Sequence, residues 1–210
     1  MSATLDLGRR IELVSMDPHF SNITIGLYQC STNAEPEYLV HSYSRLPGVR
    51  DRLNGLVRAM QVLAGMVLSG DRLRFPCGAR HQLAARRTFL EACKLGSSAP
   101  AEPRPLEIID KKLNHRVTVR SLGSGLYELA ADAPPEVAGS RLESIAGGLN
   151  KLAELNFVPG QPHRVQFGCG HAHDALVGLL LPRALNVRAI LREQEVAASR
   201  GVLVAPSAQK

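Results

Sequence analysis

The feature that most limits what this 210-residue chain can fold into is an internal repeat. The segment Arg72-Leu-Arg-Phe-Pro-Cys-Gly-Ala-Arg-His81 aligns with Arg164-Val-Gln-Phe-Gly-Cys-Gly-His-Ala-His173, and five of the ten positions are identical. Upstream, residues 52–67 align with residues 141–156, at an offset of 89 residues instead of 92. Self-similarity at a long, nearly fixed offset indicates one structural unit used twice. The sequence therefore predicts an ancient duplication.

Each half carries the same succession of hydrophobic patterns, which predicts three strands, a helix, a strand and a helix. In the first half these elements are expected at 11–14, 23–28, 38–43, 49–67, 72–75 and 82–95. In the second half they are expected at 106–109, 116–121, 126–130, 139–155, 164–167 and 173–185. Runs of strands followed by helices indicate an α+β fold. We expect an internal duplication of a β-β-β-α-β-α unit, packed with pseudo-two-fold symmetry.

A linker at 96–105, rich in Pro, Ser and Ala, marks the boundary between the repeats. We expect a first α+β repeat at 1–98 and a second at 99–210. The second repeat is expected to carry a C-terminal helix extension at 186–199 and a last strand at 201–206. A unit of about 95 residues with a thin sheet leaves apolar surface uncovered, so the repeats are expected to pack as one body.

Composition narrows the class of protein. Hydrophobic residues make up 45% of the chain and charged residues 21%, which is typical of a folded globular protein. No apolar run reaches the roughly 20 residues of a membrane helix, and the start MSATLDLGRR lacks the apolar stretch of a secretory signal. The four cysteines form no CxxC pair and no disulfide framework. We expect a reduced, cytoplasmic protein with no membrane segment.

Positive charge is concentrated in the first half. Nine of the 25 basic residues lie between Arg45 and Arg87, against two acidic residues. Such a face attracts an acidic protein or an anionic ligand, and the residues expected to bind it are Arg72, Arg74, Arg80, Arg86 and Arg87. A solvated, arginine-rich surface is the alternative interpretation. The chain has five Phe, four Tyr and no Trp, so the scarcity of base-stacking side chains argues against nucleic acid as the partner.

The two Phe-x-Cys-Gly-x-x-His segments fall at strand-to-helix turns, where glycine lets the backbone approach a ligand. If the halves pack about a two-fold axis, the turns meet and supply Cys77, His81, Cys169 and His173. Two cysteines and two histidines form a common tetrahedral shell for Zn²⁺. The sequence therefore predicts an intracellular metal-site protein, either a metal-dependent enzyme or a metal-handling accessory factor. The alternative is that the cysteines are small core residues and the histidines cap or line the turns.

The second turn carries more ionisable groups than the first. It has His171 and Asp174 where the first turn has Ala79 and Gln82. After a duplication, one copy can serve only to maintain the fold. A copy with that purely structural role is expected to lose ionisable side chains. The working site is therefore expected in the second half, supported by the first turn, and comprises Cys169, His171, His173 and Asp174.

Two further functions remain open from the sequence. In a cysteine-dependent enzyme, Cys169 at a helix N-terminus acts as the nucleophile, His171 or His173 as the base and Asp174 as the orienting carboxylate. In a non-enzymatic interaction module, the arginine-rich first half docks an acidic partner.

The segment Cys77-Gly-Ala-Arg-His81-Gln-Leu-Ala-Ala-Arg-Arg87 resembles the first metal-binding segment of nickel–iron hydrogenase large subunits, where a Cys-Gly pair precedes a histidine and an Ala-rich helix. The second cysteine of that motif has no counterpart here, the gap to the histidine is shorter, and no C-terminal cysteine pair exists. The resemblance keeps a metal-handling accessory role open, while these departures exclude an active bimetallic site.

Overall fold

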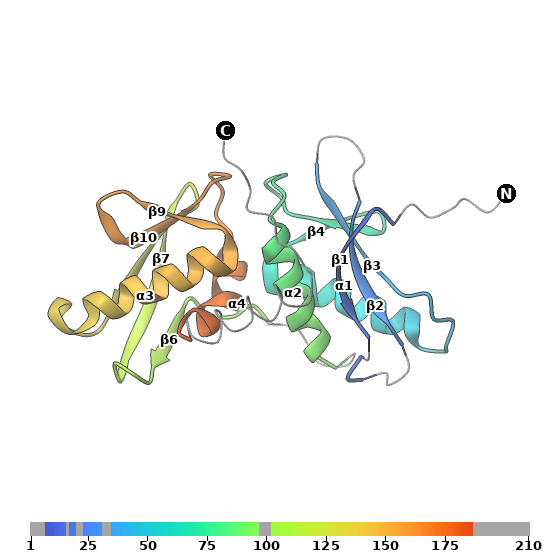
Figure 1. Ribbon diagram of the computed structural model, residues 1–210, viewed down its shortest axis with the longest axis horizontal. Coiled ribbons are helices and arrows are strands. Elements are labelled where there is room, and N and C mark those ends of the chain that lie inside the picture. Colours follow the sequence, from blue (N-terminus) through green and yellow to red (C-terminus); the bar gives the residue numbers. More distant parts are fainter. Residues whose placement is uncertain (1–6, 16, 20–22, 31–34, 97–101, 187–210) are drawn as a thin grey trace, which may run out of the picture.

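The structure is a computed structural model, which describes residues 7–15, 17–19, 23–30, 35–96 and 102–186 (Figure 1). The predicted C-terminal strand lies outside the described residues, as does the predicted helix extension beyond Asn186. No helix in the described part of the chain combines the length and apolar character that a membrane span requires.

The first half forms an antiparallel five-stranded sheet with two helices. Its strands are β1 (Arg9–Val14), β2 (Ile25–Cys30), β3 (Glu37–His41), β4 (Val67–Ser69) and β5 (Arg72–Arg74). Its helices are α1 (Val49–Ala64) and α2 (Gln82–Lys94). Across the sheet the strands follow the order β1-β2-β3-β5-β4.

The second half repeats this arrangement. Its strands are β6 (Glu107–Asp110), β7 (His115–Gly123), β8 (Leu126–Ala131), β9 (Leu155–Val158) and β10 (Gln161–Phe167). Its helices are α3 (Pro135–Ala153) and α4 (Asp174–Ala184). The sheet order is β6-β7-β8-β10-β9, the counterpart of the first sheet. The predicted α+β class is confirmed, and the two halves share both element order and sheet order.

Within the described residues, each half contains one strand that the sequence does not predict. The short strands β4 and β9 begin just after α1 and α3, where the apolar pattern had extended the helices to residues 67 and 155. Gly65 and Glu154 end the helices because both adopt the left-handed conformation, with φ of 64° and 59°. The repeating unit is therefore β-β-β-α-β-β-α.

One hydrophobic core runs through both halves. Contacts cross between the halves from α1 to α4, from α2 to α3 and from α2 to α4. The most apolar helix, α4, buries Leu176, Val177, Leu180 and Leu181 completely. The sheets lie towards opposite ends of the molecule, and α2 and α4 lie between them (Figure 1). The turns that lead into α2 and α4 are thereby brought together at the centre.

A buried arginine ties the two helices of the first half together. Arg52 of α1 donates from Nη2 to the carboxylate of Asp17 at 2.9 Å. It also donates to the carbonyl oxygens of Cys93 and Leu95, at 2.8 and 2.6 Å. Carbonyl groups at the end of a helix lack partners within the helix, and a cation there interacts favourably with the helix dipole. Arg52 therefore caps α2 from the neighbouring helix.

Arg141 does the same in the second half. It lies on α3, donates to the carboxylate of Asp110, and donates from Nη2 to the carbonyl oxygen of Leu185 at 2.7 Å. Leu185 directly follows α4, as Leu95 directly follows α2. The alignment pairs Arg52 with Arg141. In each half, an arginine of the first helix therefore caps the C-terminal end of the second helix.

Candidate metal centre

The first turn is built by the residues between β5 and α2. The N–H of Gly78 donates to the carbonyl of Phe75 at 3.0 Å, and Gly78 has a φ of 70°, which glycine adopts without strain. The turn presents Cys77, whose Sγ accepts a hydrogen bond from the N–H of Ala79 at 3.4 Å. His81 is the last residue before α2, and its Nε2 lies 3.3 Å from Cys77 Sγ.

The second turn, between β10 and α4, has the same construction. The N–H of Gly170 donates to the carbonyl of Phe167 at 3.1 Å, and Gly170 has a φ of 71°. His173 directly precedes α4, and its Nε2 lies 3.3 Å from the Sγ of Cys169. The shared Phe-x-Cys-Gly-x-x-His spacing thus produces two matching cysteine–histidine pairs.

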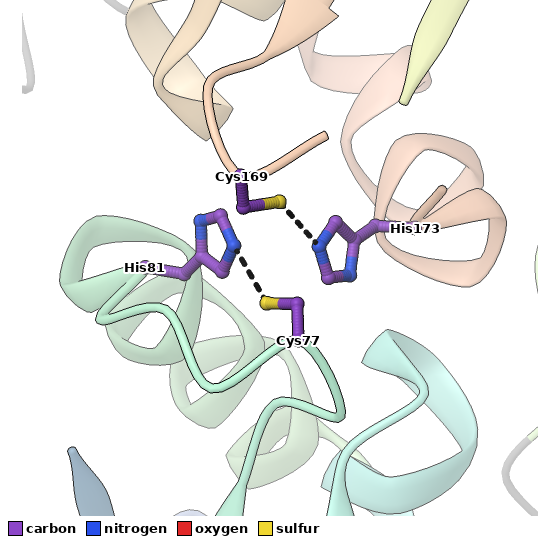
Figure 2. A group of neighbouring side chains, drawn as sticks. All are labelled: Cys77, His81, Cys169 and His173. Carbon is purple, nitrogen blue, oxygen red and sulfur yellow. Dashed lines mark hydrogen bonds between the residues drawn. The ribbon is translucent and has the colours of Figure 1, made fainter. Parts of the chain in front are cut away.

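The two pairs meet between the halves. Each residue offers one ligand atom, and all four atoms lie within 4.8 Å of one another; the residues are Cys77, His81, Cys169 and His173. Figure 2 shows the pairs approaching from opposite sides, with sulfur and ring nitrogen directed towards the centre. Bonds of about 2.0–2.3 Å to a tetrahedral zinc place its ligand atoms on the order of 3.3–3.8 Å apart. Small side-chain movements therefore suffice to close this group around one ion.

Two phenylalanine rings enclose the imidazoles. Phe75 and Phe167 are buried, and each ring lies edge-on to both His81 and His173, with centroids 4.7 to 5.8 Å apart. The histidines are only 8% and 7% exposed, whereas the two cysteines are partly exposed. The centre therefore has an apolar histidine side and a more accessible thiol side.

The buried histidines are in the protonation state that a metal requires. Burial lowers the pKa of His81, and it lowers that of His173 to about 4, together with the neighbouring charges of His81 and His171. Both imidazoles are therefore neutral near pH 7. Burial raises the pKa of Cys77, and Cys169 beside it adds to the rise. Metal binding must release a proton from this thiol, since the thiolate is the ligand form.

Behind the second turn lies a hydrogen-bond network that the sequence did not reveal. The N–H of His173 donates to the hydroxyl of Tyr127 at 2.6 Å, and that hydroxyl donates to Oδ1 of Asp174 at 2.8 Å. Tyr38 lies 89 residues earlier, at the aligned position, and is completely buried. Among the described residues, its hydroxyl has no hydrogen-bond partner. The two tyrosines occupy aligned positions, but no motif in the sequence connects either of them with a cysteine–histidine turn.

The residues predicted for catalysis by Cys169 are distributed differently from the metal ligands. His171 is exposed, and its Nδ1 lies 2.8 Å from the carbonyl oxygen of Cys169, outside the four-residue group. The hydrogen bond to Asp174 comes from Tyr127. Of the two imidazoles in this turn, the structure brings the ring of His173 to the thiol of Cys169.

Most of the arginines predicted to dock an acidic partner have contacts within the chain. Three form ion pairs in the first half: Arg72 with Glu37, Arg74 with Glu35 and Arg86 with Glu12. Arg87 is buried in α2, and Arg80 is exposed. Docking of an acidic partner stays a prediction, on a face whose charge is partly neutralised.

Comparisons of the chain with protein-family models, with curated proteins and with solved structures find no match. The function is therefore argued from the centre itself.

Proposed function

We propose that this protein binds a transition-metal ion, with zinc favoured, through Cys77, His81, Cys169 and His173. The observation that carries this proposal is the meeting of four ligand atoms within 4.8 Å, from two turns 92 residues apart in the sequence. Two thiolates and two imidazoles suit the tetrahedral, borderline-soft Zn²⁺ ion. The neutral histidines and the N–H group that donates to Cys77 Sγ support the same assignment.

The ligand count favours a structural or metal-handling role over metal-dependent hydrolysis. Catalytic zinc sites keep one position open for water or substrate, whereas four protein ligands complete a tetrahedral shell. A metal at this centre also links the start of α2 to the start of α4, and hence one half to the other. Its binding free energy then contributes to the stability of the assembled halves.

The test is the metal content of the untagged protein, measured by elemental analysis, together with Co²⁺ substitution. We expect one metal ion per chain and the absorption bands of a tetrahedral, thiolate-ligated cobalt ion. His173→Ala should lose the metal, and His171→Ala, which changes an exposed ring outside the group, is the matched control. A protein that takes up neither metal at stoichiometric concentration contradicts the proposal.

We also infer that the halves arose by duplication and pack about a pseudo-two-fold axis. Residues at equivalent positions meet across such an axis. The rings of His81 and His173 lie 4.7 Å apart, and Glu91 pairs with Arg183, which follows it by the same 92 residues. The ring of Phe75 meets His173 as that of Phe167 meets His81. These reciprocal contacts support the symmetry.

The inferred boundary between the repeats is the linker at 96–105. Residues 1–98 and 99–210, produced separately, are expected to associate on mixing and to restore metal binding, because each half supplies one ligand pair. Two halves that fold but do not associate would overturn the single packed unit.

A cysteine-dependent enzyme centred on Cys169 is the second candidate. It is favoured by the 3.3 Å approach of His173 Nε2 to the thiol, a geometry found in nucleophile–base pairs. Alkylation of Cys169 in the metal-free protein tests it: a reaction that is already fast near neutral pH, and much faster than at Cys77, supports an activated thiolate. Equal, slow reaction at both thiols contradicts it.

A further inference from the structure

Cys77 and Cys169 differ from the other two cysteines in both exposure and neighbours. Cys30 and Cys93 are 2% and 4% exposed, and burial raises the pKa of Cys93 to about 12. Cys77 and Cys169 are partly exposed, and their sulfur atoms lie within 4.8 Å of each other. An oxidant must reach the sulfur atom to react with it, so the greater exposure of this pair directs oxidation to Cys77 and Cys169.

The two thiols can approach bonding distance without rearrangement of the sheets. Both residues lie in turns, outside the helices and strands, and both sulfur atoms are directed into the space between the turns (Figure 2). A disulfide bond is about 2.05 Å long. A combined movement of less than about 3 Å therefore joins the sulfur atoms.

We propose that Cys77 and Cys169 form a reversible disulfide bond in the metal-free protein, which makes the centre a redox-controlled metal site. This proposal rests on the ligand set of the proposed function. The disulfide removes two of the four ligands, so the oxidised protein does not bind the metal. Bound metal in turn engages both thiolates and protects them from oxidation. Metal binding and disulfide formation are mutually exclusive states of one centre.

The oxidant is a low-molecular-weight disulfide of the glutathione class. One protein thiolate attacks this disulfide, forms a mixed disulfide and expels the first small thiolate. The second protein thiolate then attacks the protein sulfur of the mixed disulfide, breaks the mixed bond and expels the second small thiolate. The protein loses two electrons and the external disulfide gains them, while the two protons of the protein thiols pass to the expelled thiolates. An excess of small thiol reverses both steps.

The test is mass spectrometry of metal-free protein incubated with oxidised glutathione. We expect a loss of about 2 Da per chain and one cross-linked peptide pair joining Cys77 to Cys169. Stoichiometric Zn²⁺ should slow the cross-link at least about tenfold, because thiolate bound to metal is a poorer nucleophile. The oxidised protein should regain Zn²⁺ binding only after reduction.

Single variants supply the controls. Cys77→Ser and Cys169→Ser should each stop at the mixed disulfide, with one glutathione per chain and no cross-link. In the wild type, glutathione on both cysteines without a cross-link at saturating oxidant would overturn the proposal. A cross-link that forms equally fast with and without Zn²⁺ would instead overturn the metal site and its redox control, leaving only the disulfide. Zinc binding without any cross-link would leave the proposed function standing and overturn the inference.

Discussion

The two turns present the same ligands in the same way, but they are supported differently. Behind the second turn, the hydroxyl of Tyr127 accepts a hydrogen bond from the backbone of His173 and donates one to Asp174. Behind the first, the buried hydroxyl of Tyr38 has no hydrogen-bond partner among the described residues, and Gln82 occupies the position aligned with Asp174. The cysteine–histidine pairs match while their support does not, which is what the proposed shared metal would require, since it would act on the pairs alone.

The buried arginines also differ between the halves, but here it is the first half that has the more buried contact. Arg52 and Asp17 have side chains that are 1% and 0% exposed, whereas those of Arg141 and Asp110 are 11% and 3% exposed. The first half thus depends on a more deeply buried ion pair, and the second on its tyrosine network. The following experiments separate these two kinds of support.

The largest difference is expected at the arginines. Arg52→Ala leaves the carboxylate of Asp17 buried without its cation, which costs about 3–5 kcal/mol of the free energy of unfolding. Arg141→Ala should cost about 2 kcal/mol, because water reaches its partner more easily. Urea unfolding of the two variants measures both values, and an equal loss would remove this distinction between the halves.

At the ligands, by contrast, the halves are expected to behave alike. His81→Ala and His173→Ala each remove one of four ligands, so each should weaken Zn²⁺ binding by on the order of 100-fold or more. Competition titration with a chromogenic chelator gives the affinities. A variant of either half that keeps wild-type affinity would show that the centre is not shared.

A smaller effect is expected at the two tyrosines. Tyr127→Phe leaves the N–H of His173 and the carboxylate of Asp174 without their partner, which should cost about 1–2 kcal/mol. Tyr38→Phe removes a hydroxyl that makes no hydrogen bond among the described residues, so it should be neutral or slightly stabilising. Thermal unfolding of the metal-free variants compares them. Equal destabilisation would mean that the first half has a support of its own.

The smallest effect is expected on the free energy of unfolding at acidic pH. Burial alone would raise the pKa of Asp110, but hydrogen bonds from Arg141 and from the N–H of Lys112 bring it below its ordinary value of 3.8. Because the unfolded chain then takes up the proton at a higher pH than the folded one, this stabilisation is full above about pH 4 and is lost as the pH falls further. Asp110→Asn should therefore flatten the decline in unfolding free energy below pH 4. An unchanged slope would contradict this contribution.

The sequence predicted the fold class and the meeting of the two turns because identical residues recur at a nearly constant offset. It missed β4 and β9, since the three residues of β4 are all exposed and show no alternation. The inclusion of His171 in the working site was argued from adjacency in sequence and stays a prediction: its ring lies at the surface, while that of His173 is buried beside the thiol. The contacts of Tyr127 with the second turn depend on packing between β8 and α4, for which no local pattern exists.

The separation of the two ligand pairs along the chain has a consequence for synthesis on the ribosome. Domains generally fold from the N-terminus as the chain emerges, so the first turn is made while it holds only Cys77 and His81. Two ligands do not complete a tetrahedral shell. The remaining two arrive 92 residues later, and the centre closes only when α4 packs against the first half. With the proposed metal site, a nascent chain would not retain the ion, and uptake would mark a polypeptide whose second half has been made and docked.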